Sequence, residues 1–464
     1  MTAPTAALIP LHQLKRTSRA DTDLVMLGDR GAVTWREFST GVANWTQRLQ
    51  SRPEPRWLLA DEGVMDFCIK LLALIGAGRH IVIPPNHLAS TVRQLQQQDA
   101  FDARTDALAL LPGDAATDFK ASIDPNHVVI DLYTSGSTGE PKCIRKNLAY
   151  FELEIAAQEA LWGERAGDSA IVATAPHHHI YGLLFRIFWP LSTGRLLDTV
   201  TCQEPSTLQQ RLVAMSAYKA VSVLISSPAQ LTRFPDWLPL IELQPAPRLI
   251  FSSGGPLPAA TAVHYFEQLG GAPIEIFGST ETGGIAWRQQ TMLSDAWTPL
   301  PGITVTRDAD DGALLLQSPF LQTEALLRMD DAVALLPQGR FQLKGRLDRT
   351  VKIEEKRLSL PEMEAVLARH EWITAAALVV LDSQPADAPS RLTLGAVLVL
   401  AATGTAEWTR LGKHAATQAL RRYLAEHFDA VLLPRRWRVV VALPFNERSK
   451  LTPAALKALF DAAS

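Results

Sequence analysis

The stretch that decides the fold is VVIDLYTSGSTGEPK, residues 128–142, in which an apolar run leads into a loop of hydroxyl side chains and glycines. The run from Val128 to Tyr133 is rich in β-branched residues, which predicts a buried strand. Loops at the carboxyl ends of such strands line the crevice where open α/β sheets bind ligands. We therefore expect a ligand site directly after this strand.

The loop itself has the composition of a phosphate site. Its glycines permit turns in which successive backbone amides point at one anion, and its hydroxyl side chains add donors. Lys142 would supply a positive charge. The P-loop of nucleotide hydrolases is excluded, because Pro141 and Cys143 stand where that motif requires Gly and then Ser or Thr. A solvated Gly/Ser loop without a ligand is the structural alternative.

Composition limits the class of protein. The chain has 464 residues, 47% hydrophobic and 20% charged, which is typical of a soluble globular enzyme. A formal net charge of -3 argues against a nucleic-acid partner. No apolar run reaches the roughly 18 residues of a membrane span. Because the basic residues of the N-terminal segment follow its apolar part, we expect a cytoplasmic protein.

Cysteine and histidine patterns do not predict a metal site. The three cysteines, Cys68, Cys143 and Cys202, are widely spaced and odd in number, so we expect them to be reduced and structural. The histidines at 177–179 are adjacent, have no cysteine or carboxylate at ligand spacing, and are not expected to share one metal ion.

Periodicity predicts an α/β protein with two domains. Helix-like stretches at 35–49, 63–77 and 88–97 alternate with short β-rich runs, a pattern that continues to about residue 345 and predicts a large multi-sheet lobe with covering helices. Beyond it, the capping box from Ser359 to Glu362 predicts a helix to about residue 369. A further helix at 414–427 and strands at 375–382, 392–401 and 436–442 complete a small α+β domain. We place the domains at 1–346 and 347–464.

Two more segments have the composition of a nucleotide site. In FGSTETGG, residues 277–284, Thr280 could donate to a phosphate and Glu281 could hold a hard cation such as Mg²⁺. Glu281 could instead be a carboxylate at a helix start. SSGGPLP, residues 252–258, offers flat backbone on which a planar base could lie.

Four motifs in order resemble those of the acyl-adenylate-forming superfamily. They are YTSGSTGEPK, FGSTETGG, GRLDRTVKIEEKRLSLPEME and LPFNERSKL, and the resemblance covers nearly the whole chain. That group contains acyl-CoA and aryl-CoA synthetases, peptide-synthetase adenylation domains and firefly-type luciferases. The resemblance implies a large N-terminal domain with the ATP and acyl sites, and a small mobile C-terminal domain. It also implies ATP and Mg²⁺, with a phosphopantetheine thiol of a carrier protein or of CoA as co-substrate.

Site residues follow from the same resemblance. ATP or AMP would be bound by Thr134, Ser135, Gly136, Ser137, Thr138, Gly139, Lys142, Gly254, Gly255, Pro256, Phe277, Asp331 and Arg346. Catalysis is assigned to Lys450, Thr280, Glu281 and His179, with Mg²⁺ on Glu281. The acyl pocket is assigned to His179, Tyr181, Phe185, Gly278, Gly284 and Ile285. His179 could instead be a packed core imidazole.

The C-terminal motifs imply two half-reactions, and this sequence departs from the family pattern within them. Lys450 would be delivered by closure of the small domain about a hinge at Asp348. Glu355 stands where the family has a glycine that lets the pantetheine arm pass, which puts the thiol step in doubt but not adenylation. Ser449 before the lysine, and Asn147-Leu148 in place of Thr-His, also depart from the family pattern.

Two features of the sequence bear on the identity of the substrate and its acceptor. A bulky Phe185 should shorten the acyl cavity and favours a compact aromatic acid such as a hydroxybenzoate or cinnamate. The compact length and KIEEKRLSL also look similar to bacterial ligases of aryl polyene and xanthomonadin-type pathways, which implies an acyl carrier protein as partner. The alternatives are a fatty-acid or amino-acid adenylating ligase, luciferase-type oxygenation and a non-catalytic nucleotide-binding protein. No Asp near residues 177–185 is placed to face an α-amine.

Overall fold

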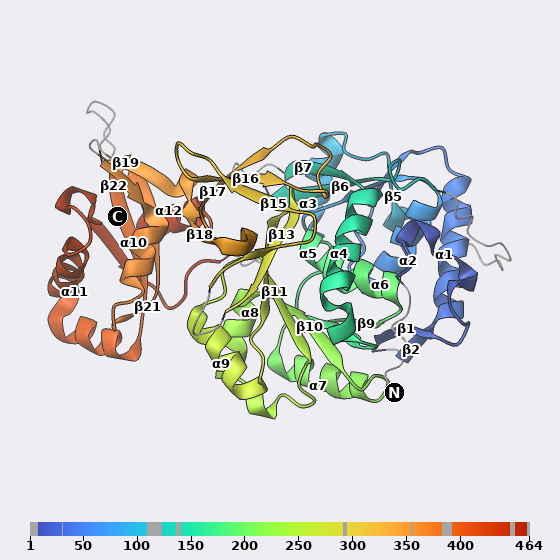
Figure 1. Cartoon of the computed structure of the whole chain (residues 1–464), viewed down its shortest axis with the longest axis horizontal. Coiled ribbons are helices and arrows are strands. Elements are labelled where there is room, and N and C mark those ends of the chain that lie inside the picture. Colours follow the sequence, from blue (N-terminus) through green and yellow to red (C-terminus); the bar gives the residue numbers. More distant parts are fainter. Residues whose placement is uncertain are drawn as a thin grey trace. The chain divides into compact units, whose positions relative to one another are not determined.

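The computed structural model describes residues 8–29, 31–108, 123–135, 141–290, 295–353, 356–382, 392–445 and 451–461. The chain divides into two compact units (Figure 1). Unit 1 comprises Met1–Thr304 and Gln317–Ala325, and unit 2 comprises Val305–Leu316 and Leu326–Ser464. This division groups a four-stranded sheet with the C-terminal part. The domain boundary after residue 346 stays a prediction.

Unit 1 contains a nine-stranded sheet with the order β14-β13-β12-β11-β10-β8-β9-β1-β2. The adjacent strands β12, β11, β10, β8, β9 and β1 are parallel. Strand β2 pairs antiparallel with β1 at one edge, and β13 and β14 pair antiparallel at the other edge. The strands are β1 Leu24–Gly28, β2 Gly31–Thr34, β8 Ala170–Ala173, β9 Leu196–Thr201, β10 Ser222–Ser226, β11 Leu249–Ser253, β12 Ile274–Ser279, β13 Gly283–Gln289 and β14 Thr298–Pro299.

A second sheet of unit 1 has five strands in the order β5-β3-β4-β6-β7. Its β6–β7 hairpin is antiparallel, whereas its other neighbours pair in parallel. The strands are β3 Arg56–Leu58, β4 His80–Ile83, β5 Ala103–Arg104, β6 Val129–Ser135 and β7 Pro141–Asn147.

Helices cover both sheets of unit 1. Their bounds are α1 Trp35–Gln50, α2 Val64–Gly76, α3 Ala89–Gln97, α4 Leu148–Ala166, α5 Ile180–Gly182, α6 Trp189–Thr193, α7 Pro205–Ser216, α8 Pro228–Arg233 and α9 Ala259–Leu269. Helix α1 begins where Thr34 and Glu37 form a reciprocal capping box. In Figure 1, α7, α8 and α9 lie along β10 and β11 of the nine-stranded sheet.

The two faces of the nine-stranded sheet bury different side chains. One face packs aliphatic residues of β8 to β11, including Leu224 and Ile250, against Leu212 of α7 and Tyr265 of α9. The other face presents Phe251 to buried aromatic rings, with Phe185 at a centroid distance of 5.0 Å. Because successive side chains of a strand point to opposite faces, the apolar runs of β10 and β11 supply both layers.

Unit 2 contains three small sheets. The four-stranded sheet has the order β15-β16-β17-β18, β19 pairs with β20, and the third sheet has the order β21-β22-β23. The strands are β15 Thr304–Arg307, β16 Ala313–Gln317, β17 Leu327–Leu335, β18 Phe341–Arg346, β19 Thr350–Ile353, β20 Lys356–Ser359, β21 Ile373–Asp382, β22 Leu392–Leu400 and β23 Arg436–Val439. The helices are α10 Leu360–Leu367, α11 Ala402–Ala425 and α12 Pro453–Asp461.

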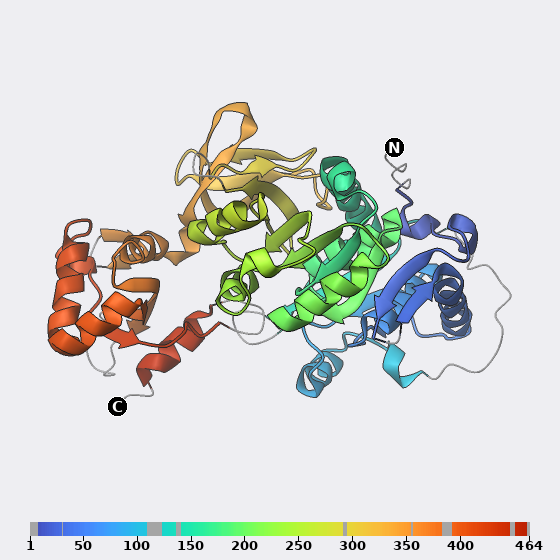
Figure 2. The ribbon, with the colours of Figure 1, turned by 90° about the horizontal axis from the view of Figure 1, so that it is seen from below.

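The alternation along β21 explains the layers of the three-stranded sheet. Leu378 packs with residues of α10 and α11 in one hydrophobic cluster. Its neighbours Ala377 and Val379 belong to a second cluster, with Leu456 and Phe460 of α12. The sheet is therefore covered on both faces, and its helices are the orange and red ribbons of Figures 1 and 2.

The predicted α/β class with several sheets is confirmed, and most predicted elements lie within two residues of the observed ones. The helix predicted at 414–427 is the exception, because α11 already begins at Ala402 and is interrupted at Gly412, which has a φ of 76°. The predicted structural role is wrong for Cys143, which is an exposed free cysteine, whereas Cys68 and Cys202 are buried. Among the helices that the structure describes, none has both the length and the apolar character needed to cross a membrane.

One buried carboxylate joins α4 to β13. Glu154 is 3% exposed, and its Oε1 accepts the N–H of Gly284 at 2.7 Å. A Cβ atom on Gly283 would lie 2.4 Å from Oε2, so only glycine leaves room for this carboxylate. Burial raises the pKa of Glu154 to about 7, against the lowering effects of the Gly284 hydrogen bond and of Lys146.

This pKa predicts a stability that falls with pH. Folded Glu154 holds its proton more tightly than the unfolded residue, whose pKa is 4.5, so its contribution is complete below pH 4.5 and is lost as the pH rises through 7. The maximal loss is about 3 kcal/mol. Glu154→Gln should remove this part of the slope in denaturant unfolding measured between pH 4.5 and 8.

The matched control is Glu164→Gln, because Glu164 is an exposed carboxylate on the same helix. This variant should keep the wild-type pH profile. Identical profiles for both variants would show that folding does not raise the pKa of Glu154.

Candidate functional site

The loop predicted to hold phosphates connects the two strands of a hairpin. Strands β6 and β7 pair from Val129 opposite Asn147 up to Ser135 opposite Pro141, so Thr134 lies opposite Lys142. The Thr134 hydroxyl donates to the Lys142 carbonyl at 3.5 Å. The predicted strand before the loop is therefore present. The predicted phosphate residues Gly136, Ser137, Thr138 and Gly139 lie outside the described residues.

The FGSTETGG motif forms a turn between two other strands. Strand β12 ends at Ser279 and β13 begins at Gly283. The backbone N–H of Ser279 donates to Oγ1 of Thr282 at 3.0 Å, and the N–H of Thr282 donates to the hydroxyl of Ser279 at 3.2 Å. These bonds close the turn and leave Thr280 and Glu281 at its tip. The alternative in which Glu281 starts a helix is wrong, because two strands flank it.

Gly278 has a structural reason to be glycine. A Cβ atom there would lie 2.2 Å from the carbonyl oxygen of Gly283 on the returning strand. The close approach of β12 and β13 thus requires this residue whether or not it also lines an acyl pocket.

An ion pair brings the two motifs together, although 139 residues separate them. Nζ of Lys142 lies 3.1 Å from Oε1 of Glu281, and the two side chains are 62% and 45% exposed. Partial burial acts to raise the pKa of Glu281, but its own backbone N–H and the Lys142 ammonium outweigh it and lower the pKa. The site therefore offers one cation and one ionised carboxylate side by side, both accessible to a ligand.

The segment predicted to lie beside a base is next to this turn. Gly254 to Pro256 follow β11, which pairs in parallel with β12 through Ser253 and Ile276. The hydroxyl of Ser253 also donates to the carbonyl of Ile276 at 2.9 Å. Gly254 has a φ of +95°, and no atom lies within 4 Å of a Cβ built there. Parallel pairing thus places this segment beside the end of β12.

Phe277, the predicted adenine partner, lies on that end of β12. Its ring is half-buried and lies 5.6 Å from the Trp297 ring, centroid to centroid. The structure thus brings Phe277, Thr280 and Glu281 to one end of one strand.

Asp331 and Arg346 lie in unit 2. They are directly opposite each other on β17 and β18. The guanidinium of Arg346 lies 3.6 Å from Oδ2 of Asp331, which is 8% exposed. The backbone of Asp348, the predicted hinge, lies in the short 3₁₀ helix Leu347–Arg349. Glu355 and Lys450 lie outside the described residues.

The predicted acyl-pocket residues come from the segment after β8 and from β13. His179 is half-buried and precedes α5, so it is not a fully packed core imidazole. Tyr181 and Phe185 follow on α5 and on the π-helical turn Leu183–Phe188, with ring centroids 5.1 Å apart. Burial raises the pKa of Tyr181 well above its usual value, so its hydroxyl stays protonated. Ile285 is fully buried on β13.

Glu154 is the residue near this region that the sequence did not reveal. Its carboxylate lies against Gly283 and Gly284, next to the predicted pocket residue Ile285. Helix α4 carries four glutamates, and no local pattern distinguishes buried Glu154 from the partly buried Glu152 and Glu159 or from the exposed Glu164.

Comparison with known proteins finds similarity to one enzyme family. Residues 81–310 match the family described as AMP-binding enzyme. The chain is 28% identical to a 4-coumarate–CoA ligase of Rhodobacter capsulatus, over 68% of this chain and 73% of that enzyme.

Two much longer relatives also match. The chain is 24% identical to tyrocidine synthase 3 of Brevibacillus parabrevis, over 99% of this chain but 8% of that protein. It is 26% identical to a dimodular nonribosomal peptide synthase of Bacillus subtilis, over 73% of this chain but 15% of that protein. The chain therefore spans only a small part of the length of these two relatives.

Solved structures share the fold over nearly the whole chain. ATP-bound MatB from Rhodopseudomonas palustris matches with a TM-score of 0.78 and 16% identity, covering 96% of this chain and 97% of that one. A benzoate CoA ligase from Burkholderia xenovorans matches with a TM-score of 0.73 and 19% identity, covering 96% and 98%. Over residues 81–310 the chain is thus similar to the AMP-binding enzymes, and it shares the fold of these solved structures over nearly its whole length.

Proposed function

We propose that this protein activates a carboxylic acid with ATP and transfers the acyl group to a thiol. In the first step a carboxylate oxygen attacks the α-phosphorus of ATP, the bond from this phosphorus to the bridging oxygen breaks, and pyrophosphate leaves with the electron pair. The product is an acyl-adenylate. In the second step the thiol attacks the acyl carbon, loses its proton, and releases AMP.

The observation that carries this proposal is the Lys142–Glu281 pair. A carboxylate that attacks a polyphosphate brings two anions together, so the site must offer positive charge. Lys142 provides one exposed ammonium at the hairpin that bears the phosphate motif. Its partner Glu281 neutralises it in the free protein, and ATP would compete for the ammonium. The pair thus joins two motifs that both serve phosphates in the proposed reaction.

The remaining nucleotide contacts are assigned in the same way. In the proposal, Thr134 and Ser135 begin the loop around the β- and γ-phosphates, and Thr280 donates to the α-phosphate. The base lies between Phe277 and the backbone of 254–256, which parallel pairing of β11 and β12 places side by side. Asp331 accepts the ribose hydroxyls with Arg346 beside it, an assignment supported by their direct opposition on β17 and β18.

Glu281 also fits the magnesium that such a reaction uses. Mg²⁺ prefers oxygen ligands, keeps several waters, and is commonly held by one or two carboxylates together with substrate phosphates. Glu281 offers one ionised, accessible carboxylate beside the proposed phosphate site. When bound there, Mg²⁺ would neutralise phosphate charge.

We propose a compact aromatic acid as the substrate class. Two observations support it: Phe185 is buried among other aromatic rings, and the chain is similar to a coumarate ligase and, in fold, to a benzoate ligase. A fatty acid or amino acid remains the alternative within the same chemistry. The thiol would belong to an acyl carrier protein or to CoA, and the similarity to a nonribosomal peptide synthase favours a carrier protein.

Domain movement completes the proposal. Residues 1–346 would hold ATP and the acid, and residues 347–464 would turn about Asp348 between the two steps. Glu355 would then lie near the path of the thiol.

Adenylation is tested by ATP–pyrophosphate exchange without a thiol, over a panel of benzoates, cinnamates, fatty acids and amino acids. We expect exchange that depends on one acid class, strongest with a hydroxybenzoate or cinnamate. Glu281→Gln should lower the rate by roughly 10²- to 10³-fold, because it removes the carboxylate that would hold Mg²⁺ beside the phosphates. Exchange with fatty acids alone would contradict the substrate class, and silence in a protein that binds ATP would favour the non-catalytic alternative.

The division of labour between domains is tested with Lys450→Ala. This variant should lose acyl-AMP formation, because the lysine would bridge the two anions only in that step. Conversion of added acyl-AMP and thiol to the thioester should remain close to the wild-type rate. Rapid-quench assays of the two half-reactions measure both quantities, and an equal loss in both would contradict separate roles.

A further inference from the structure

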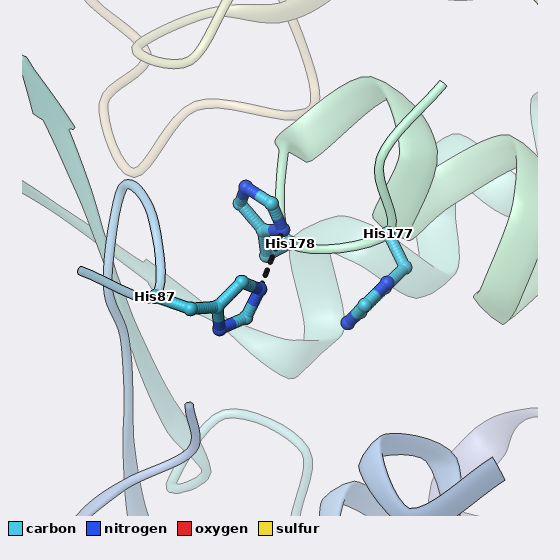
Figure 3. Close-up of side chains that lie close together, drawn as sticks. All are labelled: His87, His177 and His178. Carbon is cyan, nitrogen blue, oxygen red and sulfur yellow. Dashed lines mark hydrogen bonds between the residues drawn. The ribbon is translucent and has the colours of Figure 1, made fainter. Parts of the chain in front are cut away.

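Three histidines from two distant parts of unit 1 lie together. His87 belongs to the segment between β4 and α3, whereas His177 and His178 follow β8. Each can offer one ring nitrogen such that the three atoms lie within 4.8 Å of one another. Figure 3 shows the three rings facing a common space. The histidines at 177–179 were not expected to share one metal ion, because they are adjacent and have no cysteine or carboxylate at ligand spacing. The sequence did not reveal that His87 lies beside two of them.

Backbone carbonyls determine which nitrogens of two rings are protonated. Nδ1 of His87 lies 3.1 Å from the carbonyl oxygen of Ala60, and Nε2 of His177 lies 3.0 Å from that of Asp61. A carbonyl only accepts, so each of these nitrogens carries the proton. The other nitrogen of each ring, Nε2 of His87 and Nδ1 of His177, therefore has a lone pair; that of His87 accepts a hydrogen bond from Nδ1 of His178, whose proton a metal ion would replace. A hydrogen bond from one ring nitrogen to a carbonyl is the usual arrangement of metal-binding histidines.

The two carbonyls belong to the consecutive residues Ala60 and Asp61, and the side chain of Asp61 is bound by other residues. The carboxylate of Asp61 pairs with Lys70 and accepts a hydrogen bond from the hydroxyl of Thr105 at 2.8 Å. The Asp61 side chain therefore has its own partners, and the backbone at 60–61 is a fixed support for both rings.

The third ring completes the cluster. Nδ1 of His178 lies 3.1 Å from Nε2 of His87. In a tetrahedral site with bonds of 2.0–2.1 Å, ligand nitrogens are about 3.4 Å apart. These two nitrogens are thus already near the separation that one shared metal ion requires. The largest separation among the three ligand nitrogens, at most 4.8 Å, would have to shrink by about 1.4 Å through movement of the three rings.

The ring of His177 lies in a buried and largely apolar environment. His177 is 4% exposed, and burial, followed by the charge of Arg186, lowers its pKa to about 3. Its ring also packs edge-on against Phe67 at a centroid distance of 4.5 Å. Such a ring is an imidazole, rather than an imidazolium, over the whole physiological range.

We propose that His87, His177 and His178 bind one divalent transition-metal ion, preferentially Zn²⁺. Three imidazoles with an open fourth position suit Zn²⁺, and imidazole ligands disfavour Mg²⁺ and Ca²⁺. The site is separate from Glu281. Because His178 directly precedes His179, the ion would tie the segment bearing this residue to the segment of His87. The proposal does not depend on the proposed reaction.

The test uses the full chain without a histidine tag, freed of metal by a chelator and titrated with Zn²⁺ by calorimetry and with Co²⁺ by visible absorption. We expect one ion per chain and the absorption bands of tetrahedral Co²⁺. His87→Ala and His178→Ala should each weaken Zn²⁺ binding by roughly a hundredfold or more, since a lost ligand costs at least as much as a lost supporting hydrogen bond. His127→Ala and His414→Ala, which remove exposed histidines elsewhere, should bind as the wild type.

A further variant keeps the test independent of folding defects. His178→Cys replaces one ligand type by another, so it should retain the metal and add a sulfur-to-cobalt charge-transfer band in the near ultraviolet. Absence of that band in a folded variant would overturn the proposal. So would a wild-type affinity no higher than that of a His87→Ala/His178→Ala double variant.

Discussion

Parallel strand pairing is the constraint on which the arrangement of unit 1 depends. Parallel neighbours end at the same edge of a sheet, so the segments that follow them come together however far apart they are in sequence. This places residues 254–256, which follow β11, beside the end of β12. Lys142 lies on β7 opposite Thr134, and its ammonium is at hydrogen-bonding distance from Glu281 in the β12–β13 turn.

Local patterns predicted the elements that depend on local interactions. The β-branched run before residue 134, the Ser359 cap and the apolar repeats of α1 and α2 each gave an element close to the observed one. In the case of Ser359, the side chain accepts the N–H of Glu362 as a cap does. Motif order also predicted which residues carry phosphate chemistry, and that assignment stays a prediction. The extension of α11 to Ala402 was missed, because Gly412 interrupts the helical pattern there.

Residues defined by tertiary contacts could not be predicted in this way. Glu154 is an ordinary helical glutamate in sequence, and its raised pKa arises only because α4 packs on Gly283 and Gly284. His87 is a lone histidine in sequence, and its role depends on a partner about ninety residues away. Glu154 is buried and His87 is partly buried, and the hydrogen bonds that offset their desolvation leave no periodic pattern in the sequence.

The central claim is that the Lys142–Glu281 region binds the outer phosphates of ATP, and comparing ATP with AMP tests it most directly. AMP lacks the β- and γ-phosphates, so calorimetry on Lys142→Ala should show ATP affinity reduced by roughly tenfold to a hundredfold, with AMP affinity unchanged. Lys219→Ala, which removes a lysine paired with Asp168, is the matched control and should bind both as the wild type does. An equal loss of ATP and AMP affinity in Lys142→Ala, or no loss of either, would contradict the account.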